Sequence, residues 1–270
     1  MFIEFCIKTC GVTFIIACVL HRLNNQPGDD IGVKALNIST WKFIRIGVFF
    51  EILAWASQVL LWLVAEALKF EKTEAVSATV LCLTSLILML AAIKILHGFN
   101  GEIMQEARPF LSTLKSAIYN FGLTIPVFWG TSFLWGTFLQ LTHSLGVPVD
   151  LSPQDVVQSF SHSMDPFVMV IRVATAVVIS PILEEIIFRG FIYRALKGRG
   201  NKFVAAGFTS FIFALIHWNL LAFAGLFMLS ICLIQIYEHS ADIREPILVH
   251  ALLNAITIIC LLWNTHVTAI

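Results

Sequence analysis

The stretch SPILEEIIFRG, residues 180–190, places two adjacent glutamates and an arginine inside a run that is otherwise apolar. The whole chain shares this apolar character: 58% of its 270 residues are hydrophobic, 13% are charged, and the mean hydropathy is +0.87. Such a composition is far from that of a soluble domain and indicates an integral membrane protein. Lys+Arg and Asp+Glu are equal at 17 each, so net charge does not point to a nucleic-acid partner. The charged trio therefore lies at membrane depth, where ionisable side chains are first interpreted as functional.

Long apolar runs predict the helices of the chain, because a helix needs about 20 apolar residues to cross about 30 Å of hydrocarbon. The first run has no basic leader and no small-residue cleavage site, so we interpret it as a retained helix and not as a signal peptide. The expected fold class is all-α, a polytopic membrane bundle of about eight transmembrane helices. The predicted helices are 2–20, 46–68, 75–97, 119–142, 167–188, 203–220, 222–238 and 246–264.

Lysine and arginine in short loops predict the orientation, because they concentrate on the cytoplasmic side of a membrane. Residues 143–166 contain aspartates but no Lys or Arg, which favours the opposite side. With eight helices, both termini are then expected outside. The residues that define the cytoplasmic side are Arg22, Lys34, Lys42 and Arg45 in one loop, and Arg189, Arg194, Lys197, Arg199 and Lys202 in another.

The chain is expected to have two parts, residues 1–160 with about four transmembrane helices and residues 161–270 with the charged motifs. The segment QEARPFLSTLKSAIYNF, residues 105–121, predicts either a helix along the cytoplasmic interface or an ordinary connector. Among other polar residues, Glu51, Glu66 and Arg172 could line the cavity beside the charged motifs or a neighbouring one, but Glu51 is also close enough in sequence to Arg45 for a surface pair. Glu66 is interpreted as a helix-end residue that reaches the interface.

The glutamate pair can be analysed from helical geometry. Glu185 and Arg189 are spaced i,i+4 and share a face, whereas Glu184 points about 100° away from Glu185. Arg189 is therefore expected to neutralise Glu185 first, which leaves Glu184 with less charge compensation, as suits a general base. The alternative is that all three residues form a structural ion cluster.

Two further motifs, FALIH at 213–217 and HALLN at 250–254, each place a histidine inside an apolar run. His217 has Phe213 four residues before it, and His250 has Asn254 four residues after it. A single buried histidine is more often a hydrogen-bonded core residue than a ligand, so neither motif alone indicates a site.

The combination of these residues is more informative than each one alone. If the helices on either side of the basic turn KGRGN, residues 197–201, pack antiparallel, Glu184 and His217 come out level. His250 fits this depth less well, because it follows the helix-start signal Pro246 closely. Two chemistries remain open, a divalent metal or a water polarised without one. The candidate metal ligands are Glu184, Glu185, His217 and His250.

In this order, the motifs resemble those of the CAAX-protease and bacteriocin-processing (CPBP, or Abi) intramembrane protease family, which includes the eukaryotic prenyl-protein endoprotease. The resemblance covers about residues 165–265, and each motif stands in an apolar run. The motifs are EExxxR (Glu184, Glu185 and Arg189), FxxxH (Phe213 and His217) and HxxxN (His250 and Asn254).

The resemblance implies an eight-helix intramembrane endopeptidase that is open to the cytoplasm and cleaves a membrane-associated protein or peptide. It also implies that Glu184 and His217 activate the water, while His250 and Asn254 stabilise the oxyanion. Family members are named metalloproteases, which makes zinc the cofactor to consider, yet the chain has no HExxH motif. Because Arg189 places positive charge beside the glutamates, we expect any metal to bind weakly.

Two functions of other classes compete with the protease. Intramembrane carboxylates and histidines also occur in proton relays, so a proton-coupled transporter is one alternative, although no repeat symmetry supports it. A catalytically idle scaffold in bacteriocin self-immunity is the other. For the protease we expect the plasma (inner) membrane, with the lipid bilayer and a membrane-associated peptide as partners and no nucleic acid.

Overall fold

The structure is a computed structural model that describes Ile16 and residues 32–36, 38–71, 73–98, 108–153, 160 and 165–268. Within these ranges the regular secondary structure is helical, which confirms the predicted all-α membrane bundle. Five of the described helices are long and apolar enough to cross a membrane. The predicted helix 2–20 lies, apart from Ile16, outside the described residues. The separate helices are α2 (Thr40–Ala67), α3 (Glu74–His97), α4 (Phe110–Ser144), α9 (Lys202–Leu215), α10 (Leu220–Ser240) and α11 (Arg244–Thr268).

A central rod is formed by five elements that follow one another without a break. Asp165 caps its start by accepting a hydrogen bond from the N–H of Phe167, and Pro166 occupies the first turn, where its missing N–H costs nothing. The rod is longer than the predicted helix 167–188, because no helix stop occurs before Gly198. Its elements are α6 (Pro166–Ala174), the π-helical η1 (Thr175–Ile179), α7 (Ser180–Glu185), the π-helical η2 (Ile186–Tyr193) and α8 (Arg194–Lys197).

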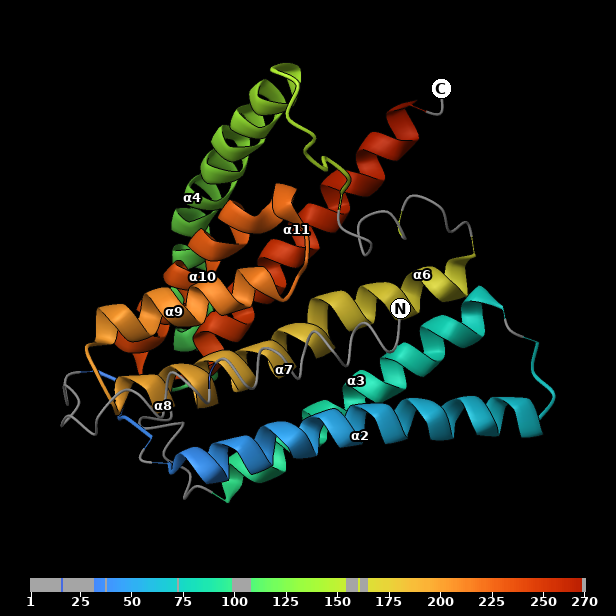
Figure 1. The fold of residues 1–270 in the computed structure, drawn as a ribbon, viewed down its shortest axis with the longest axis horizontal. Helices are drawn as coiled ribbons and strands as arrows, with labels where there is room; N and C mark the ends of the chain where they lie inside the picture. The colour runs from blue at the N-terminus through green and yellow to red at the C-terminus, as the bar shows by residue number, and fades with distance from the viewer. Residues whose placement is uncertain are drawn as a thin grey trace.

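The other helices lie on two sides of this rod (Figure 1). On one side α3 packs along α6, η1, α7 and η2, and α2 packs on α3. On the other side α9 contacts η2 and α8, α11 contacts η1 and α7, and α10 lies between α4 and α9. The rod that carries the glutamates therefore contacts most of the bundle.

The basic residues after the glutamates are buried by protein, although the sequence predicted a cytoplasmic loop there. Arg194 and Lys197 are fully buried and Arg199 is nearly so. Their side chains donate hydrogen bonds to backbone carbonyls of the segment 33–38, which comes before α2 in the chain. Lys197 also lies 2.7 Å from the carboxylate of Glu238. Since these cations are held within the fold, they are weaker indicators of orientation than free loop residues. The donors and acceptors are Arg194 Nε to Lys34 O, Lys197 Nζ to Val33 O, and Arg199 Nη2 to Ile38 O.

The corner between α9 and α10 shortens the predicted helix 203–220. Helix α9 ends at Leu215, and Trp218 then takes a left-handed backbone conformation with φ of 48°. Asn219 caps α10 by accepting a hydrogen bond from the N–H of Ala222. At 14 residues, α9 is about 21 Å long and too short to cross the hydrocarbon alone.

Helix α4 contains most of the segment 105–121 that the sequence predicted as interfacial or connecting. Residues 110–121 are the first part of this continuous 35-residue helix, and residues 105–107 lie outside the described residues. The start of α4 covers the short turn between α10 and α11, in which Asp242 and Glu245 are buried. Hydrogen bonds join Asp242 to Thr113, and Glu245 to Ser116 and Asn120.

Candidate active site

Glu185 and Arg189 form a fully buried ion pair in the rod. Arg189 Nη1 lies 2.9 Å from Glu185 Oε1, and neither side chain is exposed. The i,i+4 spacing predicted this contact. Arg189 Nη2 also donates to the hydroxyl and carbonyl oxygens of Ser230 on α10, at 3.1 and 3.2 Å. Removing one partner of this buried pair would cost several kcal/mol, because the other charge would be left unpaired. The bonds from Arg189 to Ser230 also hold the rod against α10.

His250 on α11 contacts both glutamates. Its Nδ1 lies 2.9 Å from Glu185 Oε1, and its Nε2 lies 3.9 Å from Glu184 Oε2. An ionised carboxylate only accepts hydrogen bonds, so Nδ1 carries the hydrogen of the shorter contact. The sequence predicted that His250 fits the depth of the glutamates less well than His217 does. The structure nevertheless places His250 against both glutamates. We call Glu184, Glu185, Arg189, Ser230 and His250 the glutamate cluster.

Phe213 links the second histidine to this cluster. Its fully buried ring lies 4.9 Å from the His217 ring, 6.1 Å from the His250 ring and 4.9 Å from Arg189 Cζ. Among the described residues no ion pair joins His217 to Glu184. Instead, His217 Nδ1 lies 2.7 Å from the carbonyl oxygen of Phe213. Since a carbonyl only accepts, Nδ1 must carry the hydrogen, and Nε2 keeps a lone pair.

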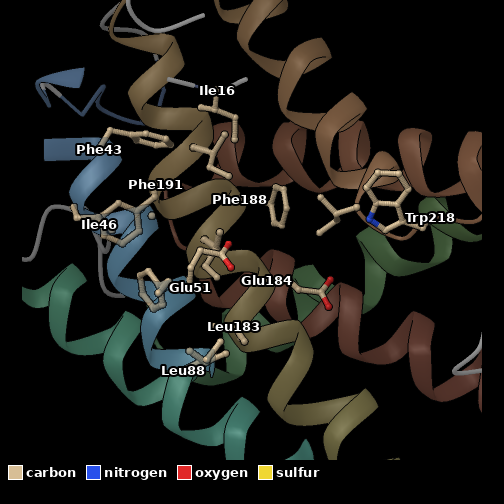
Figure 2. Close-up of a pocket in the computed structure, with 16 residues that line it drawn as sticks. Ile16, Phe43, Ile46, Glu51, Leu88, Leu183, Glu184, Phe188, Phe191 and Trp218 are labelled. Atoms are coloured by element: carbon tan, nitrogen blue, oxygen red, sulfur yellow. The ribbon is translucent and has the colours of Figure 1, made fainter. Parts of the chain in front are cut away.

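Glu184 faces a cavity of about 320 Å³, which Figure 2 shows in close-up. The cavity lies between the rod, α2, α3 and the corner after α9, and its lining is largely apolar. The side chain of Glu184 is 25% exposed, whereas Glu185 is completely buried. Of the two glutamates, Glu184 is thus the one that water and a ligand can reach.

The two π-helical segments lie immediately before and after α7, which carries both glutamates. Wide turns of this kind often occur at functional sites. In η1 the N–H of Ser180 bonds to the carbonyl of Thr175, five residues earlier. The next residue, Pro181, has no N–H to continue this pattern to Ala176. Asn254 Nδ2 donates to Ala176 O at 2.8 Å instead, so the amide satisfies the carbonyl that the proline leaves free.

The donor set does not fit a zinc site with three protein ligands. Such a site needs three donor side chains around one point. In the part of the chain that the structure describes, no group of three or more His, Cys, Asp or Glu side chains has this arrangement. Glu185 Oε1 is already shared by Arg189 and His250. The candidate ligands Glu184, Glu185, His217 and His250 therefore do not converge as the zinc prediction requires.

Sequence reasoning missed one residue near this site. Ser230 is the partner of Arg189 on α10, and the only signal was a small polar residue in an apolar run. Glu51 lines the same cavity as Glu184, which is one of the two positions that the sequence left open for it.

The fold and the cluster define a class of protein, a helical membrane protein with a buried Glu–Arg–His site beside an apolar cavity. Residues 166–256 match the family model described as type II CAAX prenyl endopeptidase Rce1-like. The resemblance of the three motifs to the CPBP intramembrane protease family is thereby confirmed for this region.

A curated relative supports the same assignment. The "Putative membrane peptidase YdiL" of Bacillus subtilis (strain 168) is 33% identical over 82 residues, which are 30% of this chain and 34% of the relative. The match thus spans about a third of the length of that protein. No solved structure matches the chain.

Proposed function

We propose that the protein is an intramembrane endopeptidase that hydrolyses a peptide bond in a membrane-associated protein or peptide. The observation that carries this proposal is the position of Glu184, a cavity-facing carboxylate in a region that matches a prenyl endopeptidase family. Its neighbour Glu185 is neutralised by Arg189 and oriented toward His250. One glutamate is thus available for chemistry while the other positions the histidine.

Glu184 is the proposed general base. It takes a proton from the attacking water and returns it to the leaving amine nitrogen as the carbon–nitrogen bond breaks. His217 assists, because its Nε2 lone pair can accept a hydrogen bond from the same water. This role follows from the bond between His217 Nδ1 and Phe213 O, which fixes the tautomer.

His250 and Asn254 are the proposed oxyanion-stabilising residues. Because Glu185 holds the Nδ1–H of His250, this histidine can donate to an oxyanion from Nε2 only in its doubly protonated form, in which both ring nitrogens carry a hydrogen. The two glutamates fix the ring before substrate binds. Preorganised donors are effective because they do not reorient during the reaction. The amide of Asn254 has two hydrogens, and its bond to Ala176 O uses one of them.

We propose that this machinery works without a tightly bound metal. The fixed charge of Arg189 repels a dication in a poorly screened site, and the described carboxylates and histidines do not converge on one point. Elemental analysis of the purified protein should find zinc well below one per chain, and chelation should leave turnover unchanged. Stoichiometric zinc whose removal abolishes activity and whose return restores it would contradict this.

The proposed location is the plasma (inner) membrane, with the site open to the cytoplasm and the bilayer and a peptide substrate as partners. To test the function, we would compare membrane peptidomes of cells that express the wild type or the Glu184→Ala variant at equal levels. Peptides that depend on Glu184 support the proposal and identify the substrate. If the two peptidomes are identical while proton-coupled uptake differs, the protein is a transporter; if neither differs, it is a scaffold.

A further inference from the structure

A second hollow lies outside the candidate active site, where the start of α2 meets the end of α3 (Figure 1). Its volume is about 290 Å³, and two cations share it with three apolar side chains. The proposed catalytic chemistry uses none of these residues. The hollow is lined by Lys42, Arg45, Ile46 and Phe49 of α2 and by Ile95 of α3.

The α2 residues of this hollow form one stripe along the helix. Their spacing in the sequence is i, i+3, i+4 and i+7, which places all four on the same side of α2. The stripe starts with Lys42 and Arg45 and continues with apolar side chains toward the middle of the helix. The hollow is therefore positively charged at the end of the helix and apolar beyond it.

Exposed side chains around the hollow mark the level of the lipid headgroups. Trp41 is 73% exposed at the start of α2, and tryptophan is enriched at the membrane–water interface. Lys94, in the last turn of α3, adds another exposed cation near this end of the helix pair. Farther along α2, exposed apolar side chains continue for several turns, as suits contact with acyl chains. They include Val48, Ile52, Trp55, Leu60 and Leu63.

Arg45 has the donors to bind a phosphate at this level. Its side chain is exposed, and its hydrogen bond to the described part of the chain runs from Nε to the carbonyl of Trp41, at 3.4 Å. A guanidinium has five N–H donors, so the four on Nη1 and Nη2 have no acceptor among the described residues. Arginine frequently binds phosphate oxygens through two parallel hydrogen bonds. The Nη groups of Arg45 can make this pair of bonds.

We propose that this hollow binds one anionic phospholipid. Arg45 holds the phosphate, Lys42 adds positive charge, and an acyl chain lies along the apolar part of the stripe. A zwitterionic phosphatidylcholine has the same phosphate, but its choline brings a second positive charge toward these cations. A soluble anion would make no use of the apolar side chains. The proposal does not depend on the protease function.

Native mass spectrometry of the purified full chain in detergent tests this site. The chain is titrated with phosphatidylglycerol, which is anionic, or with phosphatidylcholine that has the same acyl chains. The wild type should bind the first phosphatidylglycerol about tenfold more tightly than phosphatidylcholine. Arg45→Gln should weaken the binding of phosphatidylglycerol about fivefold, and Arg45→Lys, which keeps the charge, should weaken it less.

Lys69→Gln is the matched control, because Lys69 is an exposed cation just beyond the other end of α2. It should bind both lipids as the wild type does. Thermal melts without added lipid check that each variant is folded, and Lys42→Gln replaces Arg45→Gln if the latter is not. Equal affinity of the wild type for the two lipids overturns the proposal. Equal weakening in Arg45→Gln and Lys69→Gln overturns it as well, because the attraction would then be spread over the whole surface.

A competition experiment separates a lipid from a soluble phosphate. Glycerol 3-phosphate carries the phosphate and the glycerol of the lipid but has no acyl chains. At a tenfold molar excess over phosphatidylglycerol it should leave the bound lipid in place, because it cannot contact the apolar side chains of the stripe. Displacement of the lipid by glycerol 3-phosphate would show that the hollow is a site for soluble phosphates, which contradicts the proposal.

Discussion

The bundle contains two buried clusters of charge that look alike in sequence but differ in their surroundings. The glutamate cluster lies beside the cavity, and its Glu184 side chain is 25% exposed. The second, which we call the turn cluster, lies beneath the start of α4, and its carboxylates Asp242 and Glu245 are buried. It consists of Asp242, Arg244 and Glu245 at the α10–α11 turn and Thr113, Ser116 and Asn120 of α4.

Both carboxylates of the turn cluster have hydrogen-bond partners, Arg244 and Thr113 for Asp242, and Ser116 and Asn120 for Glu245 Oε1. Arg244 donates to both oxygens of Asp242, with a shortest distance of 2.7 Å. Burial by itself would raise the pKa of Asp242, but the hydrogen bonds from Arg244 and Thr113 outweigh it and lower the pKa below its ordinary 3.8. Both clusters also contain buried carboxylate oxygens without a hydrogen-bond partner, Glu184 Oε2 and Glu185 Oε2 in the glutamate cluster and Glu245 Oε2 in the turn cluster. Neither buried charge nor an unused hydrogen-bonding position is therefore enough to mark a reactive group; the feature that separates the clusters is the cavity that Glu184 lines.

The largest effect that this comparison predicts is on turnover. Glu184→Gln removes the proton acceptor but keeps the shape, so kcat should fall by about 10²–10⁴-fold while the melting temperature changes little. Glu245→Gln in the turn cluster is the counterpart: it should lower the free energy of unfolding by about 1–3 kcal/mol and leave most of the turnover. Peptidase assays and thermal melts in detergent measure both. Wild-type turnover in Glu184→Gln would remove the distinction between the clusters.

The next effect concerns stability within the glutamate cluster. Arg189→Ala strands the buried Glu185 and should lower the free energy of unfolding by about 3–5 kcal/mol. Arg172→Ala is the matched control, because Arg172 lies on the same rod and forms a 2.6 Å ion pair with the half-exposed Glu74 of α3. An exposed pair contributes only about 0–1 kcal/mol. Denaturant titration of both variants gives the difference. A smaller loss for Arg189→Ala than for Arg172→Ala would show that burial does not govern these pairs.

The smallest effect separates the structural role of Asn254 from its proposed catalytic role. Asn254→Ala leaves the carbonyl of Ala176 unsatisfied and should cost about 1–3 kcal/mol of stability. Adding Pro181→Ala supplies a backbone N–H for that carbonyl and should recover much of the loss, whereas turnover should stay low. If Pro181→Ala restores turnover too, Asn254 acts only by supporting the rod. If it restores neither, the proline does not cause the free carbonyl.

Local spacing was enough to predict part of this site. The helices that carry the motifs and the Glu185–Arg189 pair follow from apolar runs and from the i,i+4 rule, which depend on neighbours in sequence. The buried state of Arg194 and Lys197 could not be predicted in this way, because it depends on carbonyls of residues 33 and 34, about 160 positions away. The sequence therefore predicted only that they belong to a cytoplasmic loop.

The register of the histidines required three-dimensional information. The depth of His250 depends on where α11 begins, at a turn that is covered by α4. The motif HALLN contains no information about this contact with α4. The corner after α9 was more accessible to prediction, since Asn219 is a typical helix-capping residue. The apolar character of residues 203–220 masked this signal, and the predicted helix ran on through the corner.

The shortness of α9 has a consequence for the surrounding lipid. A helix of about 21 Å beside a hydrocarbon layer of about 30 Å creates a hydrophobic mismatch, and the bilayer adapts by thinning next to it. This thinning would occur beside the corner that carries His217 and Trp218, where it brings headgroups and water toward the cavity. Lipid chain length then becomes a control on the proposed protease: turnover should be higher in vesicles of short-chain phosphatidylcholine than in long-chain vesicles. Equal turnover in the two would mean that neighbouring helices, and not lipid, cover the end of α9.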